Sequence, residues 1–272
     1  MCKLICMTPI ALSIAGSDPS GGAGIQADLK TFHAHHVFGT AVLSLLTVQN
    51  TRGVRRVELV TPELVAEQIR ALFDDVPPHA IKTGAIGGAE QVEAVASVLA
   101  DYPAVPLVVD PVCVSKTRAE LLDRAGRDAL VRLLMPRATL ITPNLDEAEL
   151  LLGRTIRTGP QIEAAGRAFL DLGARAVLLK GGHREGEPID VLCMPHGLVE
   201  LHGTRIQTRH THGVGCSLSA AITARLARDE SLAEACALAK RWVASGIASA
   251  PGLGGGHGPM NHWASLPDGS DV

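Results

Sequence analysis

Aromatic residues are scarce in this sequence: Phe, Trp and Tyr make up 3% of its 272 residues, whereas hydrophobic residues make up 46%. The core must therefore be built mainly from Ala, Val, Leu and Ile, which suits helices and strands packed in layers. A chain of this length buries a full core without disulfides or metals. The six cysteines contain no CxxC pair, so their spacing favours reduced thiols over a zinc site or a disulfide framework. They are Cys2, Cys6, Cys113, Cys193, Cys216 and Cys236.

An excess of positive charge is also absent. The formal net charge is −3 and no basic cluster stands out, which argues against nucleic acid or a membrane surface as a partner. No apolar run reaches the roughly 18 residues that a membrane-spanning helix needs, and the segment from Met1 to Thr8 is too short for a signal peptide. We therefore expect a cytoplasmic protein that acts on small molecules.

Two familiar phosphate-binding loops are missing or incomplete. The pattern G-x-x-x-x-G-K-[ST] does not occur, which excludes a P-loop enzyme. Gly22 to Ala27 matches G-x-G-x-x-A, but a dinucleotide-binding domain also expects an acid at the end of its second strand. That strand ends here in Gln49 and Asn50, which disfavours an NAD-binding oxidoreductase. His33, His35 and His36 show no zinc signature, and we expect them to be solvated.

Apolar runs and helix-start signals alternate along the chain. Strands are predicted over Ile10–Ala15, Thr40–Gln49, Ala80–Lys82, Pro106–Asp110, Thr139–Thr142 and Ala176–Lys180, and a hairpin over Asp190–Met194 and Val199–His202. Helices are predicted over Ile25–His36, Thr61–Phe73, Glu90–Ala100, Ala125–Leu134, Leu145–Leu152, from Gly159 onward, Gly215–Arg228 and Ser231–Ser249. The alternation predicts an α/β fold, a three-layer α/β/α sandwich with a mainly parallel central sheet. No linker or repeat interrupts it, so residues 1–272 are expected to form one domain.

Polar or glycine-rich residues follow most of the predicted strands, where ligands bind in open α/β sheets. These positions are Gly16–Gly24, Gln49-Asn50, Thr83-Gly84, Asp110-Pro111, Thr142–Asn144 and Lys180–His183. Asp110, Asn144 and Glu147 supply the hard oxygen ligands that Mg²⁺ prefers, and Lys180 supplies a cation near the same edge. Asn144 and Glu147 equally suit a helix capping box. Gln49 or Lys180 taken alone is as readily a structural residue.

The segment from His212 to Cys216 places two glycines at the start of an apolar helix. Backbone N–H groups at a helix N-terminus favour an anion, including charge that develops during phosphoryl transfer. A plain glycine-rich turn into a buried helix is the alternative. Cys216 lies in the first helical turn, a position that lowers the pKa of a thiol. A core cysteine, a covalent nucleophile and a general base for a substrate hydroxyl all stay open for it.

Taken together, these segments resemble one known family. The segments that carry the likeness are Ala15–Lys30, Gln49–Gly53, Asp110–Val112, Thr142–Asn144 with Glu147, Lys180–His183 and Thr211–Cys216. In this order they are similar to the hydroxymethylpyrimidine/phosphomethylpyrimidine kinases of thiamine biosynthesis, a branch of the ribokinase-like superfamily. The resemblance spans nearly the whole chain, from Ile10 to Pro259. It implies transfer of phosphate from ATP to a hydroxymethylpyrimidine and then to its monophosphate, with Mg²⁺ as a cofactor, in a homodimer. A requirement for a monovalent cation such as K⁺ stays open.

The resemblance also implies roles for individual residues. Gly16, Asp28 and Gln49 would contact the pyrimidine, with Val112 packing beside it. Gly213 and Gly215 would form the anion hole, and Cys216 would be the base. Asp110 and Glu147 would act on Mg²⁺, directly or through water. Lys180, Asn144 and Lys240 would lie at the ATP.

Three departures from the family pattern affect rate and substrate range. Val214 replaces the usual Thr, Ala85 replaces a common Met and leaves a roomier pocket, and Lys116–Leu122 replaces a glycine-containing flap. A pyridoxal kinase of the same fold and a catalytically weak pyrimidine sensor are therefore the alternatives that we retain.

Overall fold

A nine-stranded sheet forms the middle layer of the protein, in the order β3-β2-β1-β4-β5-β6-β7-β8-β9. The computed structural model describes residues 8–114, 120–182 and 187–267. The strands are β1 Ile10–Ser17, β2 Phe38–Asn50, β3 Gly53–Leu59, β4 Ala80–Thr83, β5 Leu107–Val109, β6 Leu140–Ile141, β7 Val177–Leu179, β8 Asp190–Met194 and β9 Gly197–Leu201. Strands β2, β1, β4, β5, β6 and β7 run parallel, and β3, β8 and β9 join the two edges in antiparallel fashion.

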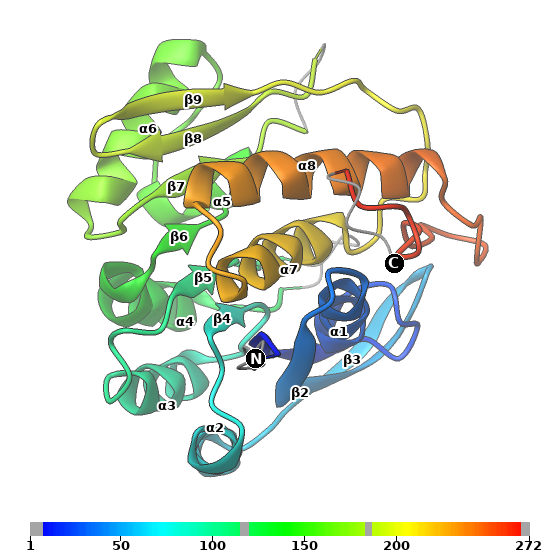
Figure 1. The fold of residues 1–272 in the computed structure, drawn as a ribbon. Coiled ribbons are helices and arrows are strands. Elements are labelled where there is room, and N and C mark those ends of the chain that lie inside the picture. The colour runs from blue at the N-terminus through cyan, green and yellow to red at the C-terminus, as the bar shows by residue number, and fades with distance from the viewer. Residues whose placement is uncertain (1–7, 115–119, 183–186, 268–272) are drawn as a thin grey trace, which may run out of the picture.

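Helices cover both faces of this sheet (Figure 1). They are α1 Gly24–Ala34, α2 Pro62–Asp75, α3 Ala89–Leu99, α4 Arg124–Ala129, α5 Leu145–Leu152, α6 Gly159–Asp171, α7 Val214–Ala227 and α8 Leu232–Ala248. Residues of α2, α3 and α6 share one large apolar core with the sheet, whereas α7 and α8 bury a second core on the opposite face. A smaller cluster joins α1 to α7. The predicted three-layer α/β sandwich with a mainly parallel sheet is confirmed.

Local sequence signals explain where several helices begin. Thr61 accepts a hydrogen bond from the backbone of Leu64 at the start of α2, with Pro62 in the first turn, as the sequence predicted. Ser231 caps α8 in the same way. The helix predicted over Ala125–Leu134 divides into α4 and a π-helical turn over Leu130–Leu134. Caps and apolar periodicity are local properties, so these helices could be predicted from the sequence.

The hairpin of β2 and β3 departs from the prediction, because β3 was not expected. Strand β2 continues past Leu46, its last residue paired with β1, and from there pairs only with β3. Gln49 therefore lies within β2 and not beyond its end. Since side chains alternate along a strand, Thr47 and Gln49 face the cavity described below, whereas Val48 is exposed.

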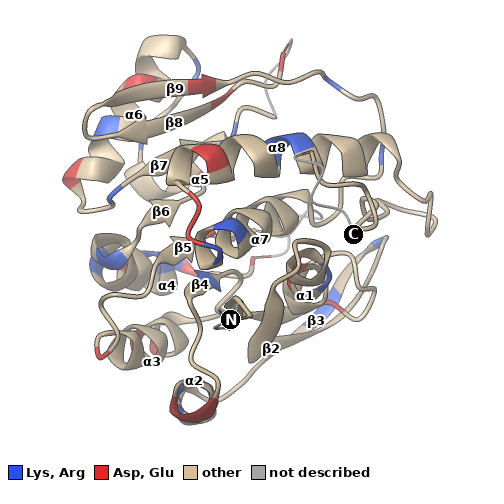
Figure 2. Cartoon of the chain, in the orientation of Figure 1, with Lys and Arg blue, Asp and Glu red and all other residues tan. Residues whose placement is uncertain are grey.

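Charged residues of both signs are spread over the helices and strands in Figure 2, and no element in this view is a run of Lys and Arg.

His35 differs from the prediction for the histidines of α1, because its side chain is fully buried. Its ring lies edge-on against Trp242 of α8, with 4.7 Å between the ring centroids. Among the described residues, no helix combines the length and the apolar character that crossing a bilayer requires.

Candidate active site

A cavity of about 1320 Å³ opens along the carboxyl ends of the parallel strands. All the residues predicted for the site, except Asp28, line it. They come from the end of β1, from β2, from the segments that follow β4 to β7, from the first turn of α7 and from α8. The sheet edge therefore gathers residues that are far apart in the sequence, as the strand-end argument predicted.

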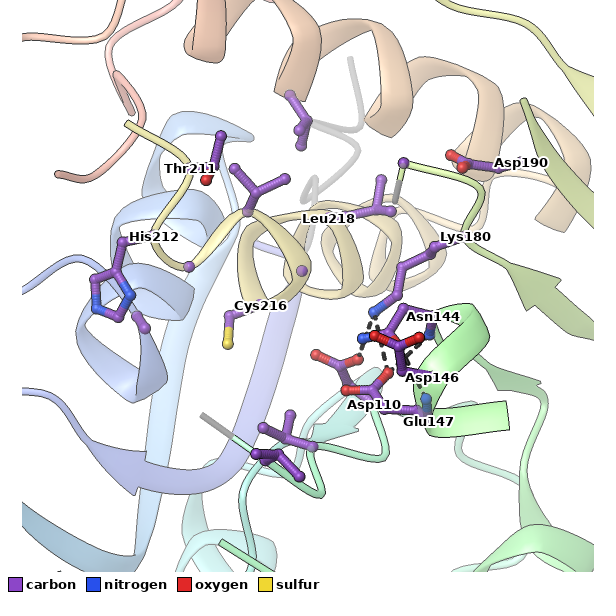
Figure 3. Close-up of a pocket in the computed structure, with 18 of the residues that line it drawn as sticks. Asp110, Asn144, Asp146, Glu147, Lys180, Asp190, Thr211, His212, Cys216 and Leu218 are labelled. Carbon is purple, nitrogen blue, oxygen red and sulfur yellow. Dashed lines mark hydrogen bonds and ion pairs between the residues drawn. The ribbon is translucent and has the colours of Figure 1, made fainter. Parts of the chain in front are cut away.

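Figure 3 shows one end of this cavity, where Lys180 points into a group of acidic and amide side chains. Its Nζ lies 3.1 Å from Asp110 Oδ1 and 3.8 Å from Glu147 Oε2. Asp110 also accepts hydrogen bonds from the hydroxyls of Thr142 (3.0 Å) and Ser219 (3.2 Å). The arrangement is a buried cation held between two carboxylates.

Charge pairing and burial set the protonation of this cluster. Burial acts to raise the pKa of Asp110, but Lys180 and Lys82 outweigh it and hold that pKa below its ordinary value. Burial acts to lower the pKa of Lys180, but the carboxylates of Asp110 and Glu147 raise it above the ordinary value. For Glu147 burial dominates and raises the pKa to about 7, with Lys180 opposing. Asp110 is therefore ionised and Lys180 protonated at neutral pH.

Asn144 and Glu147 form the capping box that the sequence offered as the alternative to a metal site. Asn144 Oδ1 accepts from the backbone N–H of Glu147 (2.9 Å), and Glu147 Oε2 accepts from the backbone N–H of Asn144 (2.7 Å). The cap fixes both side chains at the cavity wall. Mg²⁺ often binds proteins through one or two carboxylates, with phosphates and waters completing its shell. Asp110 and Glu147 fit that donor set.

The N-terminus of α7 forms the adjoining wall. Gly213 precedes the helix with φ of 71°, and a Cβ at this position would collide with the backbone carbonyl of Gly22. Only glycine suits this turn. A Cβ at Gly215 would lie 3.3 Å from Lys180 Nζ, so the ammonium lies beside the first helical turn. The helix N-terminus and Lys180 together create positive potential at one place in the cavity.

Cys216 faces the cavity from that first turn, but the pKa of its thiol is not lowered as the sequence predicted. Burial raises the pKa of Cys216 to about 11, and the neighbouring charge of Lys82 only partly opposes this. The prediction that the helix N-terminus lowers this pKa is thus wrong, because burial has the larger effect. A thiol, not a thiolate, is present at neutral pH.

Gln49 lies at the other end of the cavity beside His212. His212 Nε2 is 2.7 Å from Asp18 Oδ2 and 3.1 Å from Gln49 Nε2. Asp18 also accepts from the backbone of Ser20 and Ala23, so it organises the glycine-rich loop. Gly16, Ala85 and Val112 line the same cavity. Sequence reasoning had named His212 only as part of a motif and had overlooked Asp18.

Asp28 is not a cavity residue, which corrects the prediction that it contacts a substrate. Its side chain is fully buried, and its carboxylate accepts from Lys82 Nζ (2.8 Å) and from the Ser13 hydroxyl (2.6 Å). Sequence reasoning missed Lys82, although a lysine inside a buried strand was an available signal. Ser219 was missed as well, within an apolar helix.

Lys240 lines the cavity, but its ammonium is already engaged. Nζ lies 2.9 Å from Asp190 Oδ2 and donates to the carbonyls of Pro188 and Leu201, both at 2.6 Å. These contacts hold α8 against the β8–β9 hairpin.

Of the predicted flap over Lys116–Leu122, the segment 116–119 lies outside the described residues.

The parallel sheet, the helix N-terminus with a neighbouring lysine, and the paired carboxylates define the class of a ribokinase-like small-molecule kinase. Comparison with known proteins agrees. The family model for phosphomethylpyrimidine kinase matches residues 18–261. The hydroxymethylpyrimidine/phosphomethylpyrimidine kinase of Staphylococcus aureus is 42% identical over 260 residues, or 94% of each chain. The chain belongs to the phosphomethylpyrimidine kinase family.

Two solved structures place the fold among kinases of this type. A phosphomethylpyrimidine kinase from Clostridium difficile is 40% identical, with a TM-score of 0.78 over 86% of this chain and 97% of that one. A pyridoxal kinase from Bacillus subtilis, solved as an ADP complex, is 35% identical, with a TM-score of 0.88 over 94% and 98%. The pyrimidine and pyridoxal kinases therefore share this architecture.

Proposed function

We propose that this protein transfers the γ-phosphoryl group of ATP to the hydroxyl of 4-amino-5-hydroxymethyl-2-methylpyrimidine, and then phosphorylates the monophosphate to the pyrophosphate. One observation carries the proposal: a single cavity is lined by Gln49 and Ala85 together with Lys180, Asp110 and the N-terminal turn of α7. The family membership of the chain supports the same reaction. Cytoplasmic location and a homodimer stay predictions.

At the nucleotide end, the residues provide charge and not covalent chemistry. Lys180 would exchange part of its contact with Asp110 for the nucleotide phosphates, and Asp110 and Glu147 would hold Mg²⁺. The bound Mg²⁺ would neutralise charge on the phosphates. The backbone N–H groups of Gly213, Val214 and Gly215 would then face the equatorial oxygens of the transferred group, where charge is concentrated. Because these donors are backbone groups, Val214 in place of Thr keeps them.

At the substrate end, Cys216 lies between His212 and Lys180 (Figure 3), and its thiolate form can accept the proton of the attacking hydroxyl. A phosphoryl group passes through a loose transition state, so a base placed within reach is sufficient. Gln49 offers an amide to the aminopyrimidine, which carries ring acceptors and an exocyclic donor. Val112 and Ala85 provide the apolar wall.

The testing experiment measures ADP release with Mg²⁺ on four compounds in parallel: the hydroxymethylpyrimidine, its monophosphate, pyridoxal and pyridoxine. Turnover of both pyrimidines well above the pyridoxal compounds supports the proposal. A preference for pyridoxal would keep the kinase chemistry and change the substrate, a candidate that the open space at Ala85 favours. Ligand binding without turnover on any compound would instead indicate a pyrimidine sensor.

Replacing Gln49 with alanine is expected to weaken pyrimidine binding by about 1–3 kcal/mol, because buried polar groups of the ligand lose their partner. Isothermal titration with the pyrimidine measures this change. Val48→Ala is the matched control, since Val48 is the neighbouring residue on the exposed face of β2. Equal affinities of the Gln49→Ala variant and the wild type would show that the pyrimidine is held elsewhere.

A further inference from the structure

Lys82 is a lysine whose entire side chain is buried under the active site. It belongs to β4, and its exposed fraction is 0%. Its Nζ donates to Asp28 Oδ1 at 2.8 Å, and it lies 3.5 Å from the backbone carbonyl of Cys216. Asp28 is held from its other side by the hydroxyl of Ser13 at 2.6 Å. The ammonium therefore lies between α1 and the first turn of α7.

A path of polar contacts connects this ion pair to the catalytic cluster. The carbonyl of Cys216 also lies 3.0 Å from the Ser219 hydroxyl, which is 3.2 Å from Asp110 Oδ2. Asp110 in turn holds Lys180. The first turn of α7 thus lies close to two ion pairs, Lys82 with Asp28 and Lys180 with Asp110.

Stability alone is a weak reason for such a pair. Withdrawing two charges from water costs free energy that their attraction often fails to recover, and apolar residues of similar size commonly pack as well. Ile81 of β4 packs in one apolar core with residues of β1 and β5, and Ala80 packs in another with Ala11 of β1. The place of the pair is informative, because the ammonium contacts both the Asp28 carboxylate of α1 and the Cys216 carbonyl of α7.

We propose that Lys82 is a positioning residue for phosphoryl transfer. It fixes the carbonyl of Cys216, and with it the first turn of α7, and it adds positive charge beside the residue whose thiolate accepts the substrate proton. Asp28 holds Lys82 charged and in place. The inference rests on the proposed function for the role of Cys216 as the base.

The charges around the thiol agree with this geometry. Burial raises the pKa of Cys216, Lys82 of β4 is the strongest opposing influence, and the backbone N–H of Gly24 helps to lower it. Asp28 of α1 and Asp110 after β5 raise it. The charge of Lys180, which follows β7, also interacts with that of the Cys216 thiolate. Lys82 and Asp28 therefore act on Cys216 with opposite signs.

Because Lys82 and Asp28 shift the pKa of Cys216 in opposite directions, replacing each of them tests the proposal. The variants are Lys82→Met, Asp28→Asn and the double variant with both substitutions, which restores a neutral core if Lys82→Met alone fails to fold. Iodoacetamide labelling of Cys216 over a range of pH, followed by peptide mass spectrometry, reports the thiol pKa without any substrate. We expect this pKa to rise in Lys82→Met and in the double variant, and to fall in Asp28→Asn. A purely structural pair would shift both single variants in the same direction, or neither.

Steady-state kinetics supplies the second measurement. In Lys82→Met, or in the double variant, kcat is expected to fall at least about tenfold while the KM for ATP stays within about threefold, as for loss of assistance to a proton transfer. Folded variants with kcat within twofold of the wild type and an unchanged labelling profile would overturn the proposal. Failure of the proposed function is distinguishable, because the wild type itself would then be inactive on the pyrimidine while the labelling profiles keep their predicted order.

Discussion

Replacing Lys180 with methionine is expected to lower kcat/KM for ATP by about 10²–10³-fold, the size of effect that follows removal of one preorganised electrostatic group. Methionine is similar in length, so the change removes the charge beside the α7 N-terminus and leaves the volume nearly intact. Asp110 then loses the cation that lies 3.1 Å from its carboxylate. ADP release at saturating pyrimidine and varied ATP measures the effect, with thermal unfolding as the check that the variant is folded.

Lys240→Met is the matched control for this experiment. Lys240 is also a cavity lysine paired with an aspartate, but its ammonium is occupied by Asp190 and by two carbonyl groups. We expect it to lose stability while keeping most of its kcat/KM for ATP. If the folded Lys240 variant lost as much kcat/KM as the Lys180 variant, the role predicted for Lys240 at the nucleotide would be supported, and the larger effect expected for Lys180 would be contradicted.

Replacing Cys216 with serine is expected to lower kcat by at least about tenfold and to leave substrate affinity within a few-fold, because a hydroxyl is a poor general base. The pH profile gives a second measurement. Free wild-type enzyme carries a thiol with a pKa of about 11, so its thiolate fraction grows as pH rises through neutrality. Its kcat/KM for the pyrimidine should therefore rise with pH from about 7 to 9, whereas that of the serine variant should change little, since kcat/KM reports groups of the free enzyme.

Cys236→Ala separates this effect from the general cost of losing a buried cysteine. Cys236 is fully buried in α8 and does not line the cavity. Its replacement should lower stability and leave the pH profile of kcat/KM unchanged. Near-wild-type turnover in Cys216→Ser, or a flat wild-type profile, would remove Cys216 from the role of base.

Much of the fold could be predicted from local patterns. Thr61 with Pro62 marked the start of α2, and Asn144 with Glu147 marked the start of α5. Buried apolar runs gave the parallel strands of the centre. The edge strand β3 escaped because its sequence, Gly53–Leu59, is half polar and half exposed and lacks an apolar run. The missed strand bears on the site, because β3 pairs with the part of β2 that carries Gln49 to the cavity.

The cavity wall could also be predicted, because the carboxyl ends of parallel strands must meet at one edge of the sheet. That rule locates Asp110, Asn144 and Lys180 without coordinates. It does not reveal what each side chain contacts. Lys240 and Asp28 illustrate the limit. Lys240 lines the cavity, but its ammonium is engaged in holding the β8–β9 hairpin. Asp28 does not line the cavity and is fully buried.

The sequence by itself thus determined the α/β class, the order of most elements and the edge that carries the chemistry, because strand and helix signals act over a few residues. Only the tertiary structure decided the contacts across that edge. His212 meets Asp18 across 194 positions of the chain, and Lys82 meets Asp28 across 54. It also reversed the expected pKa shift of Cys216, because the helix N-terminus is a local effect whereas burial depends on everything packed around the thiol.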